Sequence, residues 1–220
     1  MKWPYPGAAC YSPRSRKGRR WPEVSIAVAS VGEIIWVIGV VGWYVIRYPF
    51  ERRARRVRIV TGGRSPSDTV GLASALFGLA ILPAFYVATG IPAAADHSAS
   101  AWAVALGTII FCSALWIFRI SHKELGRNWS ITLEIRERHE LVCAGPYALV
   151  RHPMYTSFLL MGLGQVFLLS NWVAGTSGLI GFAVLFLLRV DKEERMMLEN
   201  FGSQYRAYME KTKRIVPYLY

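Results

Sequence analysis

Long apolar stretches alternate with short polar ones along the whole chain. Three of them, at 24–46, 69–91 and 99–118, are near the ~20 residues that a helix needs to cross a bilayer. Glu33 is the single charge that they contain. A fourth stretch, at 153–188, runs for 36 residues without a charge and suits two short crossings that turn near Asn171. The pattern therefore predicts five transmembrane helices.

Backbone hydrogen bonding decides how these crossings are built. In lipid only helices and closed barrels satisfy every N–H and C=O group, and the period-2 alternation of barrel strands is absent, so we expect an all-α integral membrane protein. Glycines within the stretches are interpreted as close helix contacts: Gly32, Gly39, Gly42, Gly162 and Gly164. The last pair lacks the third glycine and the preceding strand of a dinucleotide-binding fingerprint, which excludes a Rossmann domain.

Charged residues are few and unevenly placed. They make up 18% of the chain, below the ~25% of an average soluble domain. All 26 Lys and Arg fall in four blocks beside the apolar stretches: 1–22, 47–64, 119–151 and 189–214. In a soluble protein a net charge of +12 would suggest nucleic acid. Beside membrane segments it indicates cytoplasmic loops that face anionic lipids, and no nucleic-acid partner is expected.

The basic residues also predict an orientation. Loop 92–98 has no Lys or Arg, whereas the loops within 47–64 and 119–151 and the tail after Arg189 are basic and should be cytoplasmic. Five crossings then place the N-terminus outside, although residues 14–20 are basic. Two alternatives stay open, because either the first stretch does not simply cross or the later loops override its flank.

The tail has a helical period. In DKEERMMLENFGSQYRAYMEKTKR, at 191–214, one stripe collects large side chains: Met197, Phe201, Tyr205, Tyr208 and Met209. Such a helix would lie along the membrane surface or fold back on the bundle.

Polar residues at the two ends of the last stretch are predicted to converge. Two antiparallel helices return to the same membrane face, so His152 and Tyr155 should come near Arg189 and Glu193. Singly, each residue has an ordinary interpretation as a headgroup contact, an interface aromatic or a surface ion pair. No metal site is expected, because the histidines and cysteines show no ligand spacing: His97, His122, His139, His152, Cys10, Cys112 and Cys143.

Four motifs in the C-terminal half occur in the order and spacing of a known family. They are GRNWS at 126–130, HELVCAGPYALVRHPMY at 139–155, RVDKEER at 189–195 and FGSQYRAYMEKTKRIVPYLY at 201–220. In these motifs the chain resembles the isoprenylcysteine carboxyl methyltransferase family, whose members are integral membrane enzymes that use S-adenosylmethionine. Before about Gly71 the resemblance does not extend beyond spans and basic linkers.

The resemblance implies a role for each matched residue. The cofactor would lie between the loop before the last hairpin and the tail helix, held by His139, Glu140, Leu141, Val142, Tyr147, His152, Pro153, Met154, Tyr155 and Glu193. Arg189 would bind the substrate carboxylate and, with Glu193, form the expected catalytic pair. Thr132 stands at a further cofactor position of the family, where the local match is loose. A prenylcysteine carboxylate has a pKa of ~3.3–3.7 and is already ionised, so no general base is required.

Three other functions were weighed. A phospholipid N-methyltransferase would need a base and is poorly served by Arg189, and a sterol reductase using NADPH has more spans than this chain. A membrane scaffold without cofactor is the third. We expect one domain over 1–220, with a variable part at 1–68 and a core at 69–220. Its expected partner is a lipidic substrate, with no obligate protein partner.

Overall fold

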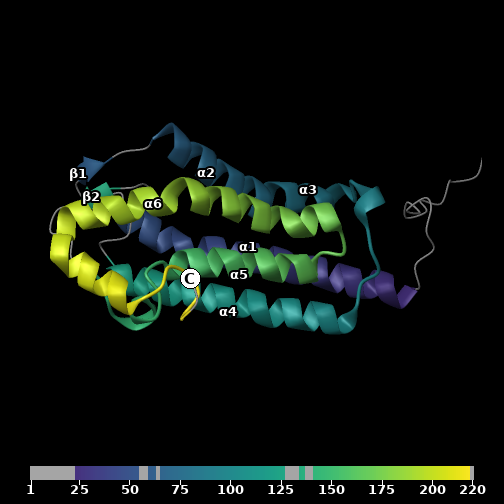
Figure 1. Cartoon of the computed structure of the whole chain (residues 1–220). Coiled ribbons are helices and arrows are strands. Elements are labelled where there is room, and N and C mark those ends of the chain that lie inside the picture. The colour runs from purple at the N-terminus through teal and green to yellow at the C-terminus, as the bar shows by residue number, and fades with distance from the viewer. Residues whose placement is uncertain (1–22, 55–58, 63–64, 127–133, 137–140, 219–220) are drawn as a thin grey trace, which may run out of the picture.

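The computed structural model describes residues 23–54, 59–62, 65–126, 134–136 and 141–218, which form an elongated helical bundle (Figure 1). Its elements in order are α1 (Glu23–Ala54), β1 (Ile59–Gly62), α2 (Pro66–Leu76), η1 (Phe77–Ile81), α3 (Leu82–Thr89), η2 (Ala93–Ala95), α4 (Ala101–Leu125), β2 (Glu134–Arg136), η4 (Gly145–Ala148), α5 (Pro153–Leu168) and α6 (Trp172–Lys211).

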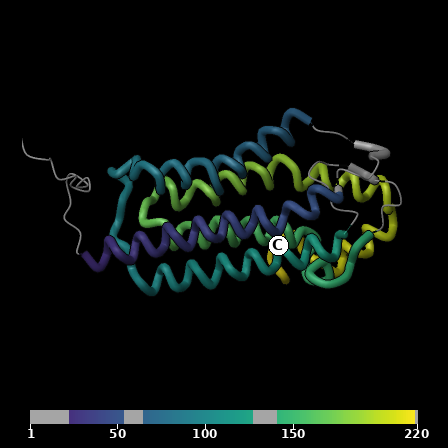
Figure 2. Tube along the Cα trace, turned by 180° about the vertical axis from the view of Figure 1, so that it is seen from behind, coloured from purple at the N-terminus to yellow at the C-terminus, as the bar shows by residue number. Residues whose placement is uncertain are grey.

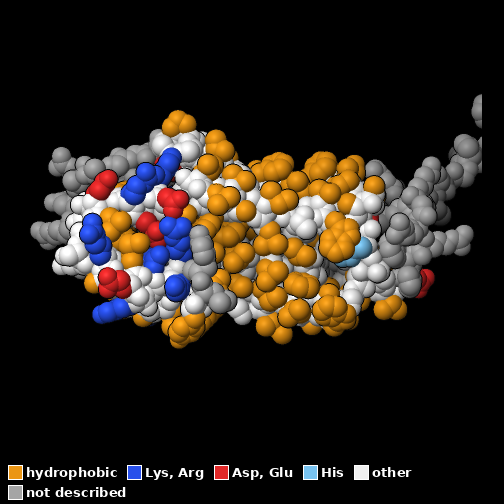
Figure 3. Space-filling model, viewed as in Figure 1, with side chains coloured by type: hydrophobic (Ala, Val, Ile, Leu, Met, Phe, Trp, Pro, Cys, Tyr) orange, Lys and Arg blue, Asp and Glu red, His pale blue; other side chains and the backbone are white. Residues whose placement is uncertain are grey.

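Five helical passes run along the bundle, in agreement with the predicted number. Four are long and apolar enough to cross a membrane: Glu23–Arg53, Pro66–Thr89, Ala101–Leu125 and Trp172–Lys211. The fifth, α5, has only 16 residues and is packed between α4 and α6. Apolar side chains cover most of the visible face, while most charged ones gather at the end where α5 begins (Figure 3). The protein is therefore an integral membrane protein with one polar end.

Close helix contacts hold the bundle, as the glycines predicted. A Cβ on Gly32 of α1 would lie 2.2 Å from the backbone oxygen of Leu168, and one on Gly162 of α5 would lie 3.0 Å from the backbone of Gly178 in α6. At Gly42 the nearest atom would be 3.6 Å away, which is ordinary contact. The helices therefore approach closely around α5, which contacts α1, α4 and α6, and also where α2 and η1 pack on α6, since a Cβ on Gly78 would clash with the Ser177 backbone.

The second pass contains a π-helical turn. The segment η1 separates α2 from α3, and Pro83 follows it at the start of α3. Proline has no N–H to donate to the preceding turn, and in transmembrane helices a local π turn can satisfy the backbone group that is left without a partner. The pass remains continuous and packs against α6.

The structure shows the path of the first apolar stretch, for which the sequence left two alternatives open. The N-terminal end of α1 lies beside the loop before α4, since the Ala99 N–H donates to Ser25 Oγ at 3.0 Å. Figure 2 shows α1 running from there to the polar end beside α4. The first stretch thus spans the full bundle length, and the basic residues 14–20 lie outside the described chain.

Two features of the polar end were not predicted. A two-stranded antiparallel sheet pairs β1 with β2, in the register Thr61↔Ile135, and adds a short β element to an otherwise helical fold. The fifth crossing and the tail helix also form one element, α6, with 40 residues. Gly202, with φ of 51°, divides it into two arms, and the second arm folds back on the bundle (Figure 1). The positive φ is readily adopted by glycine, which explains the bend.

Candidate active site

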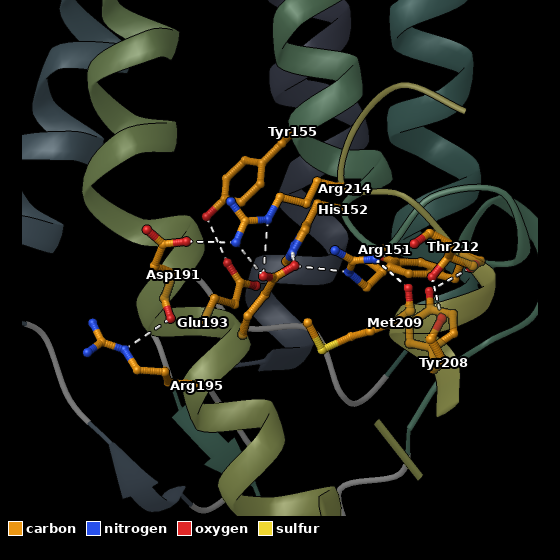
Figure 4. A network of polar contacts seen from close by, with 12 residues as sticks. Arg151, His152, Tyr155, Asp191, Glu193, Arg195, Tyr208, Met209, Thr212 and Arg214 are labelled. Atoms are coloured by element: carbon orange, nitrogen blue, oxygen red, sulfur yellow. Dashed lines mark hydrogen bonds and ion pairs between the residues drawn. The ribbon is translucent and has the colours of Figure 1, made fainter. Parts of the chain in front are cut away.

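The last two helices bring their polar ends together as predicted. Tyr155, in the first turn of α5, donates its hydroxyl to Glu193 Oε2 of α6 at 2.8 Å (Figure 4). The Tyr155 ring is buried and meets Phe186 edge to face, with centroids 5.6 Å apart. Its orientation is therefore fixed by packing on one side and by a carboxylate on the other.

Arg189 is buried at the point where the charge-free part of α6 ends. Its residue exposure is 6%, and its Nε lies 4.0 Å from Oδ1 of Asp68, at the start of α2. The interpretation of Arg189 as half of an exposed surface pair is therefore wrong. A buried guanidinium needs a nearby counter-charge, because desolvating a lone charge is costly. Sequence reasoning missed Asp68, which directly precedes the predicted second stretch.

A third carboxylate, Glu194, binds three cationic or ionisable side chains. It accepts from Arg151 Nε at 2.9 Å, from Arg214 Nη2 at 2.7 Å and contacts His152 Nε2 at 3.3 Å. Glu194 and His152 are both buried. The structure thus directs His152, which the sequence assigned to the cofactor, toward Glu194. Sequence reasoning missed Glu194, Arg151 and Arg214, since no local spacing links these three positions.

The C-terminal segment closes this part of the site. The backbone N–H groups of Arg151 and His152 donate to the carbonyls of Lys213 and Arg214, at 2.8 and 2.9 Å. The Arg151 guanidinium also donates to the Thr212 carbonyl. The chain after α6 therefore lies along the segment that leads into α5 (Figure 4).

Tyr147, in η4, has a buried hydroxyl. Its residue exposure is 7%, and Tyr208 of the second arm donates to its carbonyl at 2.6 Å. No residue in the described chain forms a hydrogen bond with Tyr147 Oη. Burial, followed by the negative charge of Glu193, raises the pKa of Tyr147 well above its usual range. The hydroxyl consequently stays protonated and is able to donate to a ligand at neutral pH.

The other predicted cofactor residues have less polar surroundings. Leu141 and Val142 are half-buried in the loop before η4, and Pro153 is buried at the first position of α5. Met154 packs against the core cluster that contains Phe111 and Phe118. Three residues named from the sequence lie outside the described chain: Thr132, His139 and Glu140.

The chemical character of the site follows from these placements. It combines the carboxylate of Glu193, the guanidinium of Arg189 and the protonated hydroxyls of Tyr147 and Tyr155, all near the end of the apolar bundle. Such a set can hold a cation on one side and a carboxylate on the other.

Comparison with known families supports the resemblance noted in the sequence. Residues 104–199 match the model of the isoprenylcysteine carboxyl methyltransferase (ICMT) family. This segment includes α4 from Val104 on, α5 and the first arm of α6 as far as Glu199, and with them Tyr155, Arg189 and Glu193. Asp68 and Arg214 lie outside it.

Curated relatives are similar over part of their length. Protein-S-isoprenylcysteine O-methyltransferase B of Arabidopsis thaliana is 34% identical over 100 residues, which is 43% of this chain and 49% of the relative. The A form from the same plant is 30% identical over 120 residues, with 54% and 61% covered. The human protein-S-isoprenylcysteine O-methyltransferase is 28% identical over 92 residues, with 42% and 32% covered. The chain thus spans about a third to three fifths of the length of these relatives.

A solved structure of a eukaryotic intramembrane Ras methyltransferase, isoprenylcysteine carboxyl methyltransferase, also aligns with the chain. The TM-score is 0.49 at 23% identity, and the alignment covers 71% of this chain and 54% of that one.

Proposed function

We propose that this protein transfers a methyl group from S-adenosylmethionine to the carboxylate of an isoprenylcysteine-like lipid. The observation that carries the proposal is the position of Arg189. Its buried guanidinium lies where the apolar part of α6 ends, one turn before the Tyr155–Glu193 contact. All three residues fall in the segment that matches the methyltransferase family.

Arg189 is suited to a carboxylate on a lipid. Its guanidinium presents a planar fork that binds both oxygens of a carboxylate, and it stays charged even when buried. The apolar part of α6 that precedes Arg189 offers a path for an isoprenoid tail along the bundle. An amine headgroup, by contrast, would be repelled by this cation. The position therefore favours an O-methyltransferase over an N-methyltransferase.

The residues near Glu193 fit a cationic methyl donor. Glu193 provides a negative charge, the buried Tyr147 hydroxyl offers an unused donor within the described chain, and Leu141 and Val142 give an apolar wall. A bound S-adenosylmethionine supplies an electrophilic methyl group, whose C–S bond breaks as a C–O bond to the carboxylate forms, leaving a thioether and a methyl ester.

No proton has to move in this reaction, since the substrate carboxylate enters ionised. The task of the chain is therefore to orient two reactants and to exclude water. Tyr155 keeps the Glu193 carboxylate in place, and Arg189 holds the substrate oxygens. Arg151, His152, Glu194 and Arg214 fix the start of α5 to α6 and to the C-terminal segment.

The site is proposed to face the cytoplasm, because three of the four basic blocks, 47–64, 119–151 and 189–214, flank this end of the bundle and follow the positive-inside rule. A water-soluble donor would then enter from the cytoplasm and the lipid from the bilayer. Since α2, α5, α6 and the C-terminal segment all contribute to this end, we propose that the chain acts as one domain.

The test combines turnover with cofactor binding. Detergent-solubilised protein is incubated with labelled S-adenosylmethionine and a panel of N-acetyl-S-farnesylcysteine, a fatty acid and phosphatidylethanolamine. We expect label in the farnesylcysteine methyl ester, and thermal stabilisation by S-adenosylhomocysteine. Stabilisation by NADPH alone would contradict the proposal, and so would labelling of the amine lipid alone. Stabilisation by neither S-adenosylhomocysteine nor NADPH would favour a scaffold.

A further inference from the structure

The residue that faces Arg189 comes from a part of the chain that the family model does not match. Asp68 lies in the first turn of α2, well before residue 104. It is 1% exposed, and its Oδ1 is 4.0 Å from Arg189 Nε. A fully buried carboxylate beside a buried guanidinium is a charge pair that the fold maintains at a cost in desolvation.

The two oxygens of the Asp68 carboxylate have different contacts. Oδ2 accepts from the Ser65 backbone N–H at 3.2 Å, and the Ser65 hydroxyl accepts from the Asp68 N–H at 3.3 Å. This reciprocal pair is a capping box, which fixes the first turn of α2. Oδ1 forms no hydrogen bond with a described residue and points to Arg189. The cap thus holds one oxygen and orients the other.

Close packing keeps α2 against α6 at this level. A Cβ on Gly71, one turn after Asp68, would lie 3.2 Å from Leu185 Cδ1 and 3.3 Å from Leu185 Cα. Lys192 Nζ also contacts Ser67 Oγ. Asp68 and Arg189 are therefore held by their helices, and their separation does not depend on flexible side chains alone.

We propose that Asp68 is a positioning residue for the substrate carboxylate, acting through Arg189. Asp68 approaches Nε, at the inner edge of the guanidinium, and an end-on carboxylate would use Nη1 and Nη2. A charge at Nε fixes the plane of the fork and directs its outer edge toward the incoming substrate. This inference rests on the proposed function and adds a residue that the matched segment lacks.

The experiment measures which substrate an Asp68 variant fails to bind. Asp68→Asn keeps an oxygen for the helix cap and removes the charge. We expect the KM for N-acetyl-S-farnesylcysteine to rise about tenfold, since a charge-assisted contact of ~1.4 kcal/mol or more is lost. The KM for S-adenosylmethionine should stay near the wild-type value, because the Glu193 side does not change. The melting temperature should fall, because the buried Arg189 guanidinium loses its counter-charge, so both KM values are measured at a temperature where the variant is folded.

Two controls separate charge from fold. Ser65→Ala weakens the same cap and keeps the Asp68 charge, so it should lower the melting temperature with little change in either KM. Asp96→Asn removes a carboxylate at the opposite end of the bundle and should leave both KM values unchanged. If Ser65→Ala reproduces the rise in the farnesylcysteine KM, Asp68 acts through the cap and the inference is overturned. It is also overturned if Asp68→Asn raises both KM values equally.

Failure of the proposed function has a different signature. In that case the wild-type protein would form no farnesylcysteine ester, and both proposals would fall together. Normal wild-type turnover with an unchanged farnesylcysteine KM in Asp68→Asn would remove the positioning role alone.

Discussion

The α5–α6 hairpin has a turn end and an open end, and the two ends use polar residues differently. At the turn end, Asn171 Nδ2 donates to the Pro92 carbonyl at 2.8 Å and to Asp96 Oδ1 at 2.9 Å, and Tyr86 donates to the same Asp96 oxygen. Asn171 Oδ1 accepts from the Ala174 N–H and caps α6. This cluster has one carboxylate and three neutral donors, and it joins α3, η2 and α6.

The open end has buried charges and unused capacity. Glu194 is saturated by Arg151, Arg214 and His152, as a structural carboxylate would be. Within the described chain Glu193 accepts only from Tyr155, and the buried Tyr147 hydroxyl has no hydrogen-bond partner. The comparison teaches that buried polarity alone does not mark an active site. What distinguishes the proposed site is that the Tyr147 hydroxyl and the Glu193 carboxylate keep unused capacity beside a closed network.

The largest effect is expected from Arg189→Ala at the open end. Removing the proposed carboxylate ligand should lower kcat/KM for N-acetyl-S-farnesylcysteine by at least about 100-fold, equivalent to about 3 kcal/mol. Binding of S-adenosylhomocysteine, measured by thermal shift, should persist. Arg195→Ala, an exposed arginine on the same helix, is the matched control and should change little. Lost cofactor binding with normal turnover at saturation would contradict the assignment.

At the open end, Glu194→Gln should disrupt the network that joins Glu194 to Arg151 and Arg214. The variant leaves the buried Arg151 guanidinium without its counter-charge, which costs about 3 kcal/mol by comparison with other buried pairs. We expect a clear fall in the melting temperature in detergent, with activity lost in parallel as the protein unfolds. Glu199→Gln, at an exposed position of α6, serves as the control. An unchanged melting temperature would show that the network is not structural.

Asn171→Ala tests the turn end. Losing the cap and the bonds to Pro92 and Asp96 should cost about 1–2 kcal/mol of stability. KM for both substrates should remain normal at a temperature where the protein is folded. Ser100→Ala is a matched control, because Ser100 precedes α4 without a side-chain cap bond. A change in KM would mean that the turn end communicates with the site.

The smallest effect is expected from Tyr147→Phe. Its hydroxyl has no partner in the described chain, so the melting temperature should not fall. If the hydroxyl binds the donor, affinity for S-adenosylhomocysteine should drop about fivefold, the value of one neutral hydrogen bond of ~1 kcal/mol. Tyr208→Phe should instead lower the melting temperature and leave the affinity for S-adenosylhomocysteine unchanged, since its hydroxyl donates to the Tyr147 carbonyl and contributes to stability. Equal affinity in Tyr147→Phe and wild type would exclude the contact.

The sequence predicted much of the open end because hairpin geometry is simple. An uncharged stretch of 36 residues must turn once, so residues at its two ends return to one face. This reasoning correctly brought Tyr155 to Glu193, and it placed the turn at Asn171. The five helical passes and the close contacts at Gly32 and Gly162 followed from composition in the same way.

The missed residues depend on contacts between distant segments. SPSD at 65–68 indicates the start of a helix, but nothing local tells that the second oxygen of Asp68 faces Arg189, 121 positions later. Arg214 reaches Glu194 only because Gly202 bends α6 back toward the bundle. His152 was assigned from its motif to the cofactor, and its neighbour Glu194 could not be weighed against that role before the helices were placed.

The continuity of α6 has a consequence for how this site tolerates change. Asn171, which caps the helix at one end, and Arg189, Glu193 and Glu194 at the other are joined by unbroken helical turns. Adding or deleting one residue between them would rotate all three side chains by about 100° at once, away from Asp68, Tyr155 and Arg151. A substitution removes the contacts of one side chain, whereas an insertion or deletion displaces all three side chains from their contacts together. The number of residues between Asn171 and Arg189 is therefore as much a part of the site as the identity of either one.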